Sequence, residues 1–334
     1  MTKSSSWLLL DVMSVRDATV VMVGGKAKQG VPWRSVLKRD SAEIFEATIE
    51  CRSLKTRTTV MLPDERYATL VPVLESSSET VHGVWVCSHQ GAEPKTLPPP
   101  TWAFLWDLET GSSVRSEAVG DVPAPWADAG VPVRRSIAES FRAFELGDAG
   151  PILAVLTRKA DGAVTRRTVV EHRLDGDHEV HFVARMGSLP NERSGAGNPL
   201  PVVRGLSVDL GITARSPESE PYLGDRVAGA LTASEQYRAI SDPDTLTLLY
   251  WHGPPAPRID WSANTATRPI LHPEDEPTAR QTAKLLKSSE PGPKVDLTLR
   301  FLTTGGEYEP IPVKATLIDL ESGERALLAI LTVR

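Results

Sequence analysis

Three histidines around one predicted hairpin are the side chains that come nearest to a metal-binding pattern. His172, His178 and His181 lie on the two arms of a hairpin that turns at 175–177. If the strand register placed His172 opposite His181, both imidazoles would lie on one face, where a surface zinc site could form. A register shifted by one residue would send them to opposite faces. Because a polar, solvated hairpin tip accounts for the same residues, we predict that they bind no metal.

Another histidine precedes two acids in a pattern that could support general-base chemistry. His272 is followed by Pro273, Glu274 and Asp275, directly before a helical pattern. Acids at a helix start also have a structural role, because they complement the helix dipole and can cap the first turn. We expect Asp275 to cap this helix, and we assign the motif to helix initiation rather than to catalysis.

The motifs of several enzyme classes are absent from the sequence. The glycine-rich stretch at 194–199 has neither the Lys-Ser/Thr pair of a P-loop nor the spacing of a dinucleotide fingerprint. No Gly-x-Ser-x-Gly elbow and no sensor-kinase motif occurs. The two cysteines, Cys51 and Cys87, cannot form a zinc site alone, and neither stands where a flavin or bilin would obviously attach. We therefore predict that the protein is not an enzyme and has no cofactor.

An aromatic stripe is the best candidate for contact with a ligand. Trp102, Phe104 and Trp106 alternate along one predicted strand and so share one face of it. Ligand pockets are mostly apolar with a few polar groups, which such a stripe could supply. The alternative interpretation is that the three side chains simply pack in a core, as aromatic stripes usually do.

Composition and charge are those of a water-soluble globular protein. Hydrophobic residues make up 40% and charged residues 24% of the 334 residues, which is typical of folded domains. No apolar run approaches the roughly 20 residues that cross a bilayer, and the start lacks the long apolar core of a secretory signal. We expect a cytoplasmic protein without membrane insertion. The net charge of −6 and the lack of a basic patch also argue against nucleic-acid binding.

Proline-rich joints divide the chain into three predicted blocks that would position these side chains. The run at 93–100 contains four prolines and predicts an extended linker. The expected division is a first domain at 1–92, the linker at 93–100, a second domain at 101–224, a connecting helix at 225–242 and a third domain at 243–334. Each domain is expected to hold an antiparallel sheet flanked by helices, which is an α+β fold.

The first block predicts two strands, then helices, then three strands. We expect strands at 7–12 and 18–23, and a short helix at 32–37. A longer helix should start at Asp40, which with Glu43 has the spacing of a capping box, and its buried face should hold Ile44, Phe45, Thr48 and Ile49. Alternation and turn residues then predict strands at 57–62, 68–75 and 81–88.

The middle and last blocks show related patterns. In the middle block we expect strands at 102–106, 113–118, 164–174, 180–186 and 202–210, with a helix at 136–146. A helix from Asp225 to Tyr237 should lead to a hairpin of 245–251 with 256–261. The chain then predicts an amphipathic helix after Asp275 and strands at 295–301, 311–317 and 327–333.

The order of these blocks resembles a known arrangement. Together with the stretch from Trp102 to Gly111 and the sequence from His272 to Asp275, it is similar to the actinobacterial triple sensor-domain family, which has a PAS–GAF–PAS architecture. The resemblance implies PAS-like first and third domains and a GAF-like, or divergent PAS, middle domain. It also implies a sensory or signalling protein that has no output domain on the same chain, and it transfers no catalytic residues.

Three function hypotheses remain open from the sequence. The first is a sensor that binds a small molecule, a protein partner or a second copy of itself. The second is an interaction scaffold that has kept the folds and lost the pockets. The third is a metal-dependent enzyme that would need the three hairpin histidines to converge. We rank them in this order, because only the third requires a specific and register-dependent geometry.

Overall fold

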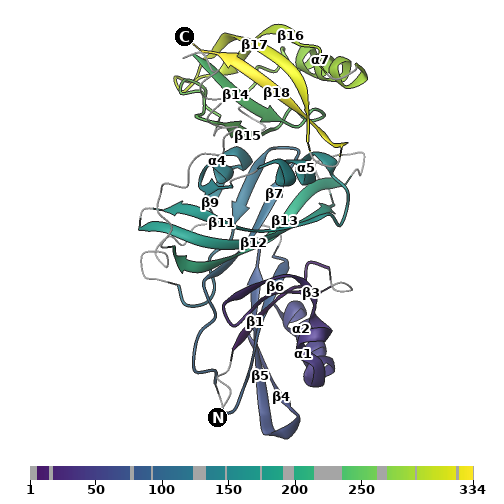
Figure 1. Cartoon of the computed structure of the whole chain (residues 1–334), viewed down its shortest axis with the longest axis vertical. Helices are drawn as coiled ribbons and strands as arrows, with labels where there is room; N and C mark the ends of the chain where they lie inside the picture. The colour runs from purple at the N-terminus through teal and green to yellow at the C-terminus, as the bar shows by residue number, and fades with distance from the viewer. Residues whose placement is uncertain are drawn as a thin grey trace.

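The described part of the chain forms three antiparallel sheets that are stacked along the long axis of the molecule (Figure 1). The computed structural model describes residues 6–14, 18–75, 79–91, 93–122, 133–146, 149–173, 175–190, 199–213, 235–261, 269–289, 292–320 and 323–333. Helices lie against the sheets, so the α+β class predicted from the sequence is confirmed at that level.

The first sheet has the strand order β3-β2-β1-β6-β5-β4 and carries its helices on one face. Strand β1 is buried on both sides: Leu8 and Leu10 pack toward the helices, while Trp7 and Leu9 face the middle sheet. Its elements are β1 (Trp7–Asp11), β2 (Thr19–Val23), β3 (Lys26–Pro32), α1 (Trp33–Leu37), α2 (Ser41–Leu54), β4 (Thr58–Leu62), β5 (Arg66–Leu74) and β6 (Val81–His89), with short 3-10 turns at Lys38–Asp40 and Pro63–Glu65.

The middle sheet has the order β10-β11-β12-β13-β7-β8-β9. One face packs on the first sheet, and the other is covered by the two helices of this block. Its elements are β7 (Thr101–Asp107), β8 (Ser112–Arg115), β9 (Val133–Ser136), α4 (Ile137–Arg142), β10 (Phe144–Glu145), α5 (Gly150–Arg158), β11 (Val164–Arg173), β12 (Gly176–Leu189) and β13 (Leu200–Ile212).

The last sheet has the order β15-β14-β18-β17-β16. Helix α7 lies over one face, and the opposite face contributes Ile240, Leu249 and Ala326 to the core of the middle block. Its elements are β14 (Gln236–Ser241), β15 (Leu248–His252), α7 (Glu276–Ser288), β16 (Val295–Leu302), β17 (Tyr308–Asp319) and β18 (Arg325–Thr332).

The same central strand order recurs in each sheet. If the strands of a block are numbered along the chain and the extra strands β3, β9 and β10 are set aside, every sheet has the order 2-1-5-4-3. The first and last strands of each block therefore pair at its centre, as β1 does with β6, β7 with β13 and β14 with β18. This order matches the repeated sequence pattern of strands, helices and three closing strands.

The structure corrects several details of the predicted elements. Strand β3 and helix α5 were not predicted, and the helix predicted at 136–146 ends at Arg142. Strand β15 pairs with β14, not with 256–261, where only Ile259 forms an isolated bridge. The predicted helix at 225–237 falls mostly on 214–234, outside the described residues, and its last two residues, Gln236 and Tyr237, begin β14. Residues 262–268 and the loop at 191–198 also lie outside the described part.

Both predicted helix caps are wrong for the same reason. Neither the Asp40 nor the Asp275 side chain accepts a hydrogen bond from its own helix. Asp40 instead pairs with Arg66 at 2.9 Å, and Asp275 binds Arg300. A carboxylate forms stronger hydrogen bonds with a guanidinium than with a neutral amide, so a distant arginine outcompetes the local backbone.

The buried face of α2 also differs from the predicted one, because Ala47 and Cys51 are buried in place of Phe45 and Ile49. Ile44, Ala47, Thr48 and Cys51 are buried, which is regular helical spacing. Ile49, predicted to be buried, is 46% exposed. Phe45 is half-buried and stacks on Trp33 with 4.8 Å between the ring centroids, so the short helix α1 is held by this contact.

Candidate ligand-binding sites

A large cavity lies in the last block, between the sheet and helix α7. Its volume is about 650 Å³, within the range of roughly 300–1,000 Å³ that is usual for small-molecule sites. The walls are mostly apolar and come from all five strands of the sheet, from α7, and from the segments at 259–261 and 269–273. The aromatic side chains in the wall are Trp251, Trp261 and Phe301.

Small side chains at facing positions explain why this space is empty. Ala279 and Ala283 lie on the buried face of α7, and Ala239, Ala315 and Ala329 line the opposite wall on the sheet. Ala239 and Ala329 are direct cross-strand partners, and so are Ala315 and Ala329. Methyl groups on both walls leave a gap that larger side chains would fill. The hydrophobic contact between helix and sheet is therefore incomplete at the centre.

Most polar groups in the wall of this cavity form hydrogen bonds, but the Nε1 of Trp251 has no partner within the described residues. Arg280 donates to Glu276 one helical turn earlier, at 2.6 Å, and to the carbonyl of Asp244 at 2.8 Å. The hydroxyl of Thr245 donates to Thr247 at 2.9 Å. Paired charges at the edge and an apolar centre favour a largely apolar ligand.

One wall of the cavity belongs to the middle block. Glu109 and Thr110, in the turn between β7 and β8, line the cavity beside residues of the last sheet. The Thr247 hydroxyl lies 3.2 Å from the carbonyl oxygens of both Leu108 and Glu109 and donates to them. The turn itself is held by Asp107, whose carboxylate accepts from the N–H groups of Glu109 and Thr110. The two blocks therefore share this wall.

The start of α7 is bound to strand β16 by hydrogen bonds between Asp275 and Arg300. The Asp275 carboxylate accepts hydrogen bonds from the guanidinium of Arg300, at 2.6 Å, and from its backbone N–H, at 2.7 Å. These bonds lower the pKa of Asp275 to about 2. His272 accepts from the N–H of Glu274 and packs edge-on against Tyr308, which agrees with a structural role for the motif at the helix start.

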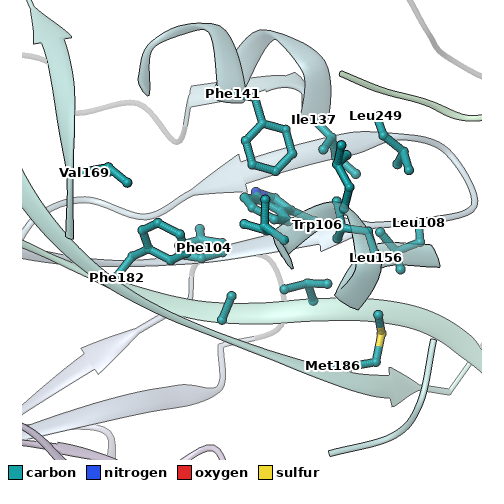
Figure 2. Close-up of a cluster of buried hydrophobic side chains, with 14 of the residues drawn as sticks. Phe104, Trp106, Leu108, Ile137, Phe141, Leu156, Val169, Phe182, Met186 and Leu249 are labelled. Atoms are coloured by element: carbon teal, nitrogen blue, oxygen red, sulfur yellow. The ribbon is translucent and has the colours of Figure 1, made fainter. Parts of the chain in front are cut away.

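The predicted aromatic stripe lies at a second, much smaller cavity. Trp102, Phe104 and Trp106 are 2%, 7% and 5% exposed and lie in the main core cluster. Figure 2 shows Trp106 below Phe141 of α4, with Phe104 beside Phe182. The cavity between this face and α4 has a volume of about 70 Å³. Its other walls include Ser113, Arg115, Arg135, Glu171 and Ser207.

A network of charged side chains borders this small cavity. The Arg115 guanidinium lies 4.2 Å from the centroid of the Trp102 ring and 3.6 Å from Glu171. Arg173 pairs with Glu171 and, at 2.7 Å, with Asp209. Burial opposes ionisation of Asp209, but its hydrogen bonds from Arg173, Gly211 and His178 outweigh this effect and lower its pKa.

The three hairpin histidines do not converge. His172 lies opposite Asp177 and hydrogen-bonds it at 2.8 Å, His178 lies opposite Glu171 and contacts Asp209, and His181 lies opposite Thr168. His181 faces the first sheet, while His178 is on the other face. Within the described residues, no group of three or more histidine, cysteine, aspartate or glutamate side chains is arranged to hold a metal ion.

The two ends of the chain each match the model of a known protein family. Residues 6–99 match the family described as Rv3651-like, N-terminal, and residues 221–334 match Rv3651-like, C-terminal domain. The two ends of the chain are therefore similar to the two Rv3651-like domains. The large cavity is lined almost entirely by the Rv3651-like C-terminal domain, and the aromatic stripe lies between the two matched regions.

One solved structure shares the fold of this chain. An uncharacterised protein from Mycobacterium tuberculosis is 23% identical, with a TM-score of 0.79 over 98% of this chain and 96% of that one. An RNA-binding light-oxygen-voltage receptor is 11% identical over 70% of this chain and 95% of that one, with a TM-score of 0.23. The periplasmic sensory domain of the Campylobacter jejuni chemoreceptor Tlp1 is 10% identical over 69% and 71%, with a TM-score of 0.22.

Only the mycobacterial structure bears on the fold, because the other two TM-scores are too low to support an argument. No match was found among curated proteins. In the described residues, no helix has the length and apolar character needed to span a membrane.

The sequence reasoning found the aromatic stripe and missed the larger cavity. A signal for the cavity was present in the sequence: Ala279 and Ala283 are four residues apart on α7, and alanines also occur within β14, β17 and β18. These positions could have been paired only if the register of the last sheet had been known.

Proposed function

We propose that the chain is a sensory module that binds a small, largely apolar molecule in the 650 Å³ cavity of its Rv3651-like C-terminal domain. The observation that carries the proposal is the cavity itself, since a domain that served only as a scaffold would gain stability by filling it. The proposal includes PAS-type first and third blocks and a GAF-type middle block, supported by the shared 2-1-5-4-3 strand order.

The shared wall suggests how binding of a ligand in the large cavity affects the middle block. A ligand that contacts the turn at Glu109 and Thr110 touches both the last and the middle block. Any ligand that prefers one arrangement of this turn shifts the population toward that arrangement. The signal would then pass through surface contacts to a separate partner protein.

Binding of a neutral fluorescent apolar probe, phenylnaphthylamine, tests the proposal. The full chain should bind it with one site, seen as enhanced probe fluorescence. Ala283 of α7 is fully buried in the cavity wall, so Ala283→Phe should place a ring in the cavity and weaken binding by about tenfold or more. Ala329→Leu fills the opposite wall and should act in the same direction.

The matched control is Leu285→Phe, on the outward face of the same helix, where the side chain is 58% exposed. It should leave binding unchanged. Absence of binding to the wild-type chain, or equal weakening by Ala283→Phe and Leu285→Phe, would favour the scaffold hypothesis instead.

A further inference from the structure

We propose that the small cavity beside the aromatic stripe is a separate binding site for a short-chain carboxylate. This inference goes beyond the proposed function, since the site lies in the middle block and shares no lining residue with the large cavity. It rests on two unpaired hydroxyls, an excess positive charge, and a cavity whose size fits a ligand of a few atoms.

Strand register brings the polar groups together with the aromatic ones. Ser207 of β13 lies opposite Trp102 of β7, and Ser113 of β8 lies opposite both Trp106 of β7 and Arg135 of β9. Directly opposed residues of antiparallel strands project to the same face. The two serines, Arg135 and the aromatic stripe therefore all face α4, where the cavity lies.

The two serines are buried residues whose hydroxyls form no hydrogen bond within the described part of the chain. Ser113 is 5% exposed and Ser207 is 2% exposed. Neither side chain forms a hydrogen bond with any other part of the chain that the structure describes. Both serines line the cavity, so their hydroxyls are placed to donate to an acceptor inside it. They can donate to a ligand oxygen without breaking any existing bond.

The charges around the cavity leave one positive group uncompensated. Arg115 and Arg173 are engaged with the carboxylates of Glu171 and Asp209. Arg135, an exposed residue of β9, also lines the cavity, and it forms no ion pair within the described residues. Glu171 faces the same space, but its charge is balanced by the two arginines that contact it. The net field in the cavity therefore favours an anion, and a guanidinium suits a carboxylate best.

Size and lining distinguish a carboxylate from other anions. A cavity of 70 Å³ holds about five water molecules, or a ligand of about five non-hydrogen atoms. The rings of Phe104, Phe141, Phe144 and Phe182 also line the cavity. An ethyl or methyl group can rest on these rings, whereas a phosphate would place oxygens against them without donors. A carboxylate with a short apolar tail can therefore bind the polar lining groups through its oxygens and pack its tail against the rings.

Saturation-transfer NMR on the full chain tests this assignment with propionate as the probe. Propionate should bind one site with millimolar affinity, as expected for so few atoms. Propionamide, which has the same shape and no charge, should bind at least about tenfold more weakly, and inorganic phosphate should not displace propionate. Water alone in the cavity would give no transfer to propionate, and that result would overturn the proposal.

Two variants on one strand separate the site from a general charge effect. Arg135→Gln should weaken propionate binding by about tenfold, because it removes the uncompensated charge. Arg134→Gln, one residue earlier on β9 and on the opposite face, should leave binding unchanged. Ser207→Ala should weaken binding several-fold with the fold retained. Equal effects of the two arginine variants, or no effect of Ser207→Ala, would also overturn the proposal.

Discussion

At the scale of single residues, two histidines in the interface between the first and middle sheets have a pKa well below the ordinary value of 6.5. His82 is 1% exposed and its Nδ1 lies 3.0 Å from the carbonyl oxygen of Gly205. Because a carbonyl only accepts, Nδ1 carries the proton and Nε2, which has no partner, is bare. His181 is fully buried and contacts Thr168 through Nδ1. Burial lowers the pKa of each to about 4, and Arg166 adds to the effect at His181.

These lowered pKa values predict a loss of stability in mild acid. The unfolded chain takes up protons on both histidines near pH 6.5, whereas the folded chain does so only near pH 4. The unfolded state therefore binds more protons in this window, and the free energy of unfolding should fall as the pH drops from 6.5 to 4. Each histidine contributes up to about 3 kcal/mol across the window.

Urea denaturation at several pH values measures this effect. In His181→Gln the slope of unfolding free energy against pH should be smaller by up to about 1.4 kcal/mol per pH unit within the window. His172→Gln is the matched control, because its side chain is 52% exposed and lies on the same hairpin. If both variants keep the wild-type slope, the buried histidines are not the groups responsible.

At the scale of elements, the packing of one strand on the next depends on a glycine. Gly205 of β13 lies opposite Phe104 of β7, and a Cβ built at this glycine would lie 2.0 Å from the Phe104 ring. The ring therefore occupies the space that a side chain would need. Its position in turn shapes the small cavity, since Phe104 is one of its walls.

Gly205→Ala should destabilise the protein by about 1–3 kcal/mol, because the buried ring must leave its place. It should also abolish propionate binding if the small cavity is the site. Gly305→Ala is the control: its built Cβ meets only the Thr303 hydroxyl, at 3.5 Å, and its stability should change little. Differential scanning calorimetry of the two variants gives the comparison, and equal transition temperatures would contradict the packing account.

At the scale of the whole molecule, buried polar contacts join the layers. Asp11 of the first sheet is fully buried and pairs with Arg185 of the middle sheet at 3.1 Å. Lys159 of the middle block pairs with Asp242, which is 2% exposed, in the last block. Together with the Thr247 contact to the turn between β7 and β8, these bonds connect each sheet to its neighbour. A change at one layer can therefore reach the next.

Thr247→Val should uncouple the large cavity from the middle block. Addition of phenylnaphthylamine to the wild-type chain should slow amide hydrogen exchange at 108–111, because the bound probe orders the turn that forms part of its wall. The variant loses the hydroxyl that holds the Leu108 and Glu109 carbonyls, so it should still bind the probe but show less protection there. Equal protection in both proteins would mean that the turn does not report occupancy.

The sequence alone determined most of the local structure. Alternation along the closing strands, the helical spacing of apolar residues at 279–286 and the repeated block pattern predicted elements that the structure confirms. On that helix the predicted face also included Leu285, which is exposed. These signals are local, because hydrophobic period and turn residues act over a few neighbouring positions. For the same reason the aromatic stripe could be recognised as one face of a strand.

Only the tertiary structure decided which groups meet. Asp275 binds Arg300 across 25 positions rather than its own helix, and His172 meets Asp177 rather than His181. Ser113, Arg135 and Ser207 join the aromatic stripe only through strand register, and the large cavity exists only because alanines of α7 and the last sheet face one another. Such contacts depend on register and on the competition between distant partners, neither of which a local pattern contains.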